Sequence, residues 1–288
     1  MQREDDTAYA MSGVIAAMER LPVESNDRLA EGMGLEAALV TYLSQGLKVK
    51  AYMVKPQGDG IWPGLVYCRG GIGRVGMLRL PRMMTLAARG YVVFAPVYRG
   101  NLGGERRDEF GGEDRHDVFA AIAALRSLPY VAPGRVPLIG FSRGAVMALL
   151  AAAHCPDAGP VAVWGGVSDL LLTYEERVDL RRMLRRVVGH PKKEPEQYAR
   201  RSPVAWASHI TAPVLMLHGT NDEQVGVEHA RRLAAALTSA GKPHTLRIYD
   251  GLGHLFPEEE DKQALNELFA WFKRYDDFGQ DGGGITNE

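Results

Sequence analysis

The chain has 288 residues, 46% of them hydrophobic, which is enough to bury the core of one large domain or two small ones. Its 34 Lys and Arg residues nearly balance its 35 Asp and Glu residues, and the net charge of −1 argues against nucleic acid or an anionic membrane as a partner. The acidic N-terminus lacks the apolar core of a signal peptide, and no run of 18 apolar residues could span a membrane. We therefore expect a cytoplasmic protein. Cys68 and Cys155 lie in apolar segments and are expected to be buried thiols, with a disulfide left open.

The first part of the chain predicts a helix followed by a β-hairpin. Residues 1–33 are assigned to an N-terminal helical segment, with the helical pattern over 8–33. Two apolar runs, 38–43 and 47–54, flank Gln45-Gly46, and this arrangement predicts an antiparallel hairpin. The second run alternates apolar and charged residues, which is typical of a half-exposed edge strand.

Short apolar runs then alternate with segments of helix length. Continuous apolar runs are typical of strands covered on both faces, and the alternation predicts parallel strands joined by right-handed crossovers. The predicted fold class is therefore α/β, a doubly wound and mostly parallel sheet opened by the hairpin, over residues 34–275. The expected strands are 64–68, 91–95, 136–141, 161–164, 214–218 and 244–249, and the expected helices are 77–89, 114–127, 143–155, 226–241 and 258–274.

Two segments do not fit the simple alternation. Residues 168–210 are too long for one crossover and predict one or two helices inserted as a partial lid. The tail over 276–288 has the composition of a flexible segment. The basic stretch of the insertion either attracts anionic substrates or forms a solvated helix face with pairs such as Asp179 with Arg182; its arginines are Arg181, Arg182, Arg185 and Arg186.

The pentapeptide Gly140-Phe141-Ser142-Arg143-Gly144 carries the strongest functional signal. It follows an apolar strand and precedes an Ala-rich helix, which is the context of a nucleophile elbow. Gly at both flanking positions allows a sharp turn, which lifts the Ser142 hydroxyl out of the sheet at a helix N-terminus. An ordinary Gly-rich turn is the alternative interpretation.

A serine nucleophile needs a base and an orienting acid, at the carboxyl ends of neighbouring strands. Asp222 follows the strand over 214–218, and His254 follows the strand over 244–249, in the chain order Ser, acid, His. Asp169 is a rival acid and Asp250 a weaker one, since an Asp after a strand is often a turn residue or a helix cap. His218 lies within an apolar strand and is expected to be a hydrogen-bonded core residue.

The oxyanion of an acyl transfer also needs hydrogen-bond donors. We expect one to be the backbone N–H of Arg143, directly after the nucleophile, and the second to come from the loop Arg69-Gly70-Gly71. No metal or organic cofactor is needed for this chemistry. An ordinary glycine turn is the alternative interpretation of the loop.

In these features the chain resembles the catalytic domain of the prolyl oligopeptidase family, within the α/β-hydrolase fold. The resemblance implies Ser142 as nucleophile, Asp222 as acid and His254 as base. It runs from about Tyr42 to Phe256 and rests on Gln45-Gly46-Leu47-Lys48-Val49, Arg69-Gly70-Gly71, Ala88-Arg89-Gly90-Tyr91-Val92-Val93, Tyr98-Arg99-Gly100, Gly112-Glu113-Asp114 through Asp117, the elbow, Ser202-Pro203, Pro213 to Gly219 with Asp222, and Gly253-His254.

The chain departs from the family pattern in two ways. Arg69 stands where the family commonly has His or Tyr, and its guanidinium either points into the site to bind an anionic group of the substrate or lies on the surface. Only about 40 residues precede the hairpin, so we expect no β-propeller of the kind that restricts the family's peptidases. This second departure favours small ester substrates over peptides.

The sequence therefore predicts a serine hydrolase of the carboxylesterase type that forms an acyl-enzyme on Ser142. An exopeptidase or amide hydrolase acting on short peptides is the alternative within hydrolysis. A non-catalytic ligand-binding protein on a hydrolase fold is the alternative of another class. The expected partner is a small-molecule ester or a short peptide, and self-association into a homo-oligomer is left open.

Overall fold

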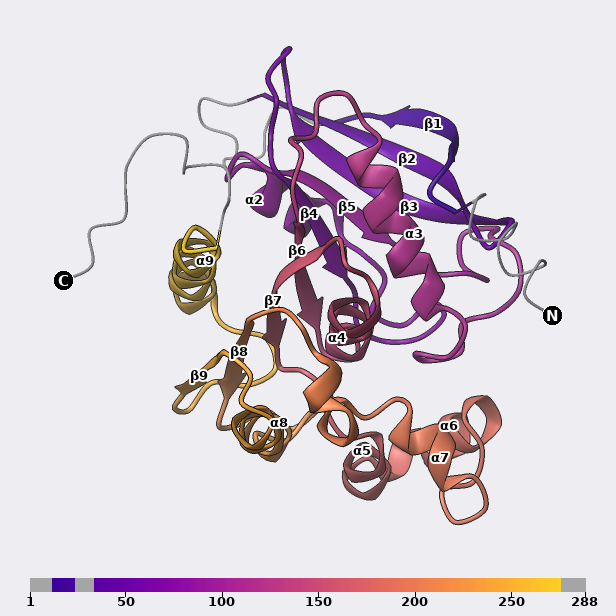
Figure 1. Ribbon diagram of the computed structural model, residues 1–288, viewed down its shortest axis with the longest axis vertical. Helices are drawn as coiled ribbons and strands as arrows, with labels where there is room; N and C mark the ends of the chain where they lie inside the picture. Colours follow the sequence, from indigo (N-terminus) through magenta and orange to yellow (C-terminus); the bar gives the residue numbers. More distant parts are fainter. Residues whose placement is uncertain (1–11, 24–33, 276–288) are drawn as a thin grey trace.

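A single nine-stranded sheet forms the centre of the computed structural model, which describes residues 12–23 and 34–275. The strand order is β1-β2-β3-β5-β4-β6-β7-β8-β9. The pairings of β1 with β2, β2 with β3 and β3 with β5 are antiparallel, whereas every pairing from β5 to β9 is parallel. This confirms the predicted fold class, a mostly parallel α/β sheet that opens with an antiparallel hairpin (Figure 1).

The hairpin is confirmed, but the helix predicted before it is wrong where the structure describes it. Strands β2 (Leu35–Ser44) and β3 (Leu47–Pro56) are joined by Gln45 and Gly46, both with positive φ. Residues Ile15–Leu21 form strand β1, which pairs with β2. Hydrogen bonds from β2 thus override the helix-forming residues of this segment. Because β1 and β5 flank the hairpin, β3 is an interior strand and not the predicted edge. The rest of the proposed segment 1–33 lies outside the described residues, as does the proposed tail 276–288.

The parallel strands agree with the predicted apolar runs to within about three residues. Their side chains are almost all buried up to β8, as strands covered on both faces require. They are β4 (Gly64–Cys68), β5 (Val92–Pro96), β6 (Val136–Phe141), β7 (Ala158–Trp164), β8 (Val214–Gly219) and β9 (His244–Tyr249).

Helices cover both faces of the sheet and divide the core into two layers. Residues of α3 (Arg115–Arg126), α4 (Gly144–His154) and α8 (Glu228–Ser239) pack in one apolar cluster. Residues of α2 (Leu80–Ala87) and α9 (Glu258–Phe272) pack in the other (Figure 1). Cys68 and Cys155 are buried free thiols. No helix within the described ranges is long and apolar enough to cross a membrane.

The segment over 168–210 is helical, as predicted, but it forms three short α-helices and not one or two. It contains α5 (Leu170–Glu176), α6 (Arg181–Val187), α7 (Pro195–Ala199) and short 3-10 turns at Val178–Leu180, Pro203–Ala205 and Ala207–His209. Figure 1 shows α5, α6 and α7 grouped at one end of the molecule. Leu170, Tyr174, Leu184 and Tyr198 pack together there on Phe110, which belongs to the main domain.

The arginines of α6 are partly held by the insertion itself. Arg181 donates to the backbone carbonyls of Tyr174 and Glu175, and Arg185 donates to the Tyr174 hydroxyl at 2.6 Å. Asp179 pairs with Arg177 at 2.7 Å, and not with Arg182 as expected. The wrong partner reflects local geometry, because Asp179 lies in a 3-10 turn between α5 and α6 and not on the continuous helix that the expected spacing requires.

Candidate active site

Ser142 stands on a strained turn between β6 and α4. Its φ is +56°, a left-handed conformation that is uncommon for a residue with a side chain and that clusters at functional sites. The two flanking glycines permit the turn. A Cβ at Gly140 would lie 2.6 Å from the carbonyl oxygen of Gly144, and a Cβ at Gly144 would overlap the carbonyl oxygen of Cys68. The pentapeptide therefore folds as the nucleophile elbow that the sequence predicts.

Replacing Gly144 with alanine should destabilise the fold. The added methyl group meets the β4 backbone, which cannot move without disturbing its pairing with β6, so a loss of about 2 kcal/mol or more is expected. The free energy of unfolding in urea measures it. Gly253→Ala is the matched control, because a Cβ there would lie 3.7 Å from its nearest neighbour. If both variants were as stable as the wild type, the proposed steric reason for glycine at position 144 would be wrong.

Asp222 and His254 form a hydrogen-bonded pair beyond the ends of β8 and β9. Nδ1 of His254 lies 2.7 Å from Oδ2 of Asp222, and both residues are buried. A carboxylate only accepts, so Nδ1–H donates and Nε2 is left with a free lone pair for a proton. The imidazole also lies 4.8 Å, ring to ring, from Phe141, the residue before Ser142. The fold thus brings the predicted acid, base and nucleophile to one edge of the sheet.

The surroundings of Asp222 keep it ionised. Burial alone would raise its pKa, but hydrogen bonds from His218 and His254, the charge of His254 and the Val225 N–H outweigh burial and hold the pKa well below its usual value. Oδ1 accepts the N–H groups of Gln224 and Val225 at 2.9 Å each, which leaves Oδ2 to face His254. Nε2 of His218 lies 2.7 Å from the Val225 carbonyl, which confirms His218 as a hydrogen-bonded core residue.

The two rival acids have other partners. Oδ1 of Asp169 caps the start of α5 by accepting the N–H groups of Leu171 and Leu172, and its Oδ2 pairs with Arg232 at 3.0 Å. Asp250 accepts the Thr220 hydroxyl in a turn. The structure therefore selects Asp222 as the carboxylate next to His254.

The loop after β4 lies directly against the nucleophile. A Cβ on Gly70 would be 2.8 Å from Cβ of Ser142 and 3.3 Å from its Oγ. Among the hydrogen bonds of the described residues, none uses the N–H of Gly70, Gly71 or Arg143 as its donor. These are the three residues that the sequence predicts as the oxyanion hole, and their N–H groups are free to bind a substrate oxygen.

Arg69 adopts neither of the two arrangements expected from the sequence. Its side chain is 1% exposed, and its Nη1 and Nη2 groups are occupied by protein acceptors. They donate, at 3.0 to 3.1 Å, to the carbonyl oxygens of Gly70, Gly73, Val75 and Val97. The proposed substrate-binding role is therefore corrected to a structural one, because the guanidinium is buried and both of its terminal nitrogens donate to backbone carbonyls.

The contacts of the Arg143 side chain were not predicted in the sequence analysis. This side chain is also 1% exposed, and Nη1 donates to the Gly71 carbonyl at 2.7 Å. The same guanidinium pairs with Asp108 at 2.8 Å and with Asp114 at 2.7 Å. Burial would lower the pKa of Arg143, but Asp108 and Asp114 outweigh it and hold the pKa above its ordinary value. Arg143 is therefore fixed in two ways: its backbone belongs to the elbow, and its guanidinium is held by the two carboxylates and the Gly71 carbonyl.

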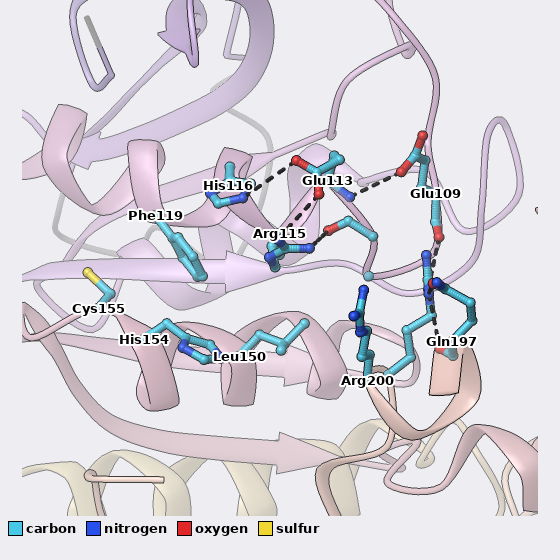
Figure 2. Close-up of a pocket in the computed structure, with 13 residues that line it drawn as sticks. Glu109, Glu113, Arg115, His116, Phe119, Leu150, His154, Cys155, Gln197 and Arg200 are labelled. Carbon is cyan, nitrogen blue, oxygen red and sulfur yellow. Dashed lines mark hydrogen bonds and ion pairs between the residues drawn. The ribbon is translucent and has the colours of Figure 1, made fainter. Parts of the chain in front are cut away.

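A separate cavity of about 670 Å³ lies outside this centre, against α3, α4 and α7. Figure 2 shows Glu113, His116, His154 and Arg200 around it. None of Ser142, Asp222 and His254 lines this cavity. We therefore place the chemistry at the ends of β6, β8 and β9, and not in this cavity.

Comparisons with known proteins agree with this geometry. The sequence pattern of the prolyl oligopeptidase family, Peptidase_S9, matches residues 78–277. The uncharacterized peptidase YtmA of Bacillus subtilis is 44% identical over 236 residues, which are 81% of this chain and 92% of that protein. Dipeptidyl-peptidase 5 of Porphyromonas gingivalis is 24% identical over 74% of this chain, but this stretch is only 34% of that protein.

Solved structures show the same fold. The acylaminoacyl peptidase of Pyrococcus horikoshii aligns with a TM-score of 0.75 and 21% identity, over 89% of this chain and 44% of that one. The chain thus spans under half the length of this neighbour, although it spans most of YtmA. Because the family pattern covers more than half of the sequence, the chain belongs to the prolyl oligopeptidase family and is a serine hydrolase.

Proposed function

We propose that the protein is a serine peptidase that cleaves amide bonds of short peptides through an acyl-enzyme on Ser142. The observation that carries the proposal is the buried hydrogen bond between Asp222 and His254, beside the elbow that holds Ser142 at a positive φ. Strained backbone at a serine next to an oriented imidazole is the arrangement of an activated nucleophile.

The proposed reaction has two halves. Nε2 of His254 takes the proton of the Ser142 hydroxyl, and the oxygen attacks the scissile carbonyl. The resulting oxyanion accepts one hydrogen bond from the N–H of Arg143 and another from an N–H of the loop at Gly70 and Gly71. His254 then gives its proton to the leaving amine. Water attacks the acyl-enzyme in the second half, with His254 as base again, and Asp222 stabilises the imidazolium in both.

The choice of amide over ester substrates rests on the relatives. YtmA, dipeptidyl-peptidase 5 and the acylaminoacyl peptidase all carry peptidase names. In the sequence analysis, the small number of residues before the hairpin favoured small esters. That argument is weakened because YtmA, which carries a peptidase name, is matched over 92% of its own length. The peptidase alternative therefore replaces the carboxylesterase interpretation.

Substrate panels separate these possibilities. Purified protein is assayed with amino-acyl and dipeptidyl p-nitroanilides and with p-nitrophenyl acyl esters of increasing chain length. We expect turnover of at least one anilide, abolished in Ser142→Ala. Ester turnover without any anilide turnover would return the carboxylesterase interpretation. Inactivity toward both panels, with Ser142 unreactive, would favour the non-catalytic binding protein.

A further inference from the structure

The direction of a backbone N–H is set by whatever holds the carbonyl of the same peptide group. In a trans peptide the C=O and the N–H point to opposite sides of the chain, and the described residues contain no cis peptide bond. A side chain that donates a hydrogen bond to the carbonyl on one side of the chain therefore directs the N–H of the same peptide group toward the other side. This rule applies directly to the loop that borders Ser142.

Two side chains hold the carbonyls of the peptide groups that carry the loop donors. The Tyr98 hydroxyl donates to the carbonyl of Arg69 at 3.1 Å, which fixes the N–H of Gly70. Nη1 of Arg69 donates to the carbonyl of Gly70 at 3.0 Å, which fixes the N–H of Gly71. Neither N–H has an acceptor among the described residues. Each peptide group is therefore held through its carbonyl, and its N–H remains available to a substrate oxygen.

Arg143 links this loop to the elbow. Its Nη1 reaches the Gly71 carbonyl at 2.7 Å, while its backbone follows Ser142. Its guanidinium lies 4.8 Å from the centre of the Tyr98 ring and 4.9 Å from that of Phe110. Asp108 and Asp114 fix its position, so the loop cannot move away from Ser142 without breaking a buried, charge-assisted contact.

We propose that Tyr98 and the Arg143 side chain are positioning residues: Tyr98 orients the N–H of Gly70 toward the oxygen of the tetrahedral intermediate, and Arg143 holds the loop of Gly70 and Gly71 against Ser142 through the Gly71 carbonyl. The inference rests on the proposed function but concerns residues outside the catalytic triad. Oriented donors need no reorganisation during the reaction, and removing one such donor typically costs 10² to 10³ in kcat. Loosening its orientation should cost part of that factor.

Tyr98→Phe is the first test, with Tyr42→Phe as its matched control. Both tyrosines are fully buried, and each hydroxyl donates to one backbone carbonyl, that of Arg69 or that of Asp117. We expect similar small losses of melting temperature in the two variants. Only Tyr98→Phe should lower kcat on a p-nitroanilide, about 3- to 10-fold, with KM within about twofold.

Arg143→Lys is the second test and guards against a fold effect in the first. It keeps the charge facing Asp108 and Asp114, but one ammonium group cannot reproduce the forked contacts that include the Gly71 carbonyl. We expect kcat to fall about tenfold or more, again with little change in KM and with cooperative unfolding retained.

Wild-type kcat in both Tyr98→Phe and Arg143→Lys would refute the positioning role and leave the proposed function intact. An equal loss of kcat in Tyr42→Phe and Tyr98→Phe would also refute it, because the effect would then be one of general stability. A wild-type protein that turns over neither anilides nor esters would instead refute the proposed function, and this inference with it.

Discussion

Replacing Ser142 with alanine should lower kcat on the best p-nitroanilide by a factor of about 10³ or more. The alanine cannot form the acyl-enzyme, and the remaining oxyanion donors supply only residual catalysis. The measurement is kcat at saturating substrate, with the free energy of unfolding as a check. We expect that free energy to change little, because alanine fits the space and the strained φ of +56° stays the same.

Ser168→Ala is the matched control for this variant. Ser168 is also buried and also lies next to an imidazole, since its Oγ is 3.4 Å from Nδ1 of His229. However, its hydroxyl donates to the His229 carbonyl at 2.7 Å and holds the start of the insertion. Activity should survive this change. Loss of activity in Ser168→Ala with activity retained in Ser142→Ala would place the nucleophile elsewhere.

Replacing Asp222 with asparagine should also lower kcat strongly, by about 10⁴. The amide retains the shape of the carboxylate, but it can present N–H to the ring and favour the tautomer in which Nε2 carries the proton. His254 then cannot act as a base. The kcat of Asp222→Asn on the same p-nitroanilide measures this loss, and Asp169→Asn should stay within a few fold of the wild type because Asp169 caps α5.

The same substitution should change how stability depends on pH. The pKa of Asp222 is lower in the folded protein than in the unfolded chain, where it is about 4. Its ionised form therefore stabilises the fold above that value, and this contribution falls as the pH drops toward the folded pKa. Asp222→Asn should lower the melting temperature more at pH 7 than at pH 3. An equal effect at both values would contradict the depressed pKa.

Much of the fold, and the positions of the proposed triad residues, could be predicted from local sequence. Strand β4 has the predicted bounds, Gly64–Cys68, because a short continuous apolar run between turn residues is typical of a fully buried strand. Ser142 was identifiable because the sharp turn requires glycine at positions 140 and 144, where any side chain would collide with neighbouring backbone atoms. Asp222 and His254 were identifiable because parallel strands bring their carboxyl ends to one edge of the sheet.

Features that depend on distant partners were not predictable. Residues Ile15–Leu21 have the composition of a helix but take a strand conformation from their pairing with β2. The roles of Arg69 and Arg143 depend on long side chains. Arg143 meets Asp114 and Asp108, which lie 29 and 35 residues earlier in the chain. No local pattern indicates such a contact, so the sequence left Arg69 open between substrate binding and a surface position, and it indicated no role for the Arg143 side chain.

Covalent labelling tests the central claim most directly, namely that His254 and Asp222 activate Ser142. Folded protein is treated with a fluorophosphonate at neutral pH, and the modified peptide is identified by mass spectrometry. We predict one adduct per chain, on Ser142, and labelling slowed at least about a hundredfold in His254→Ala. An unlabelled Ser142, or an unchanged rate in His254→Ala, would contradict it.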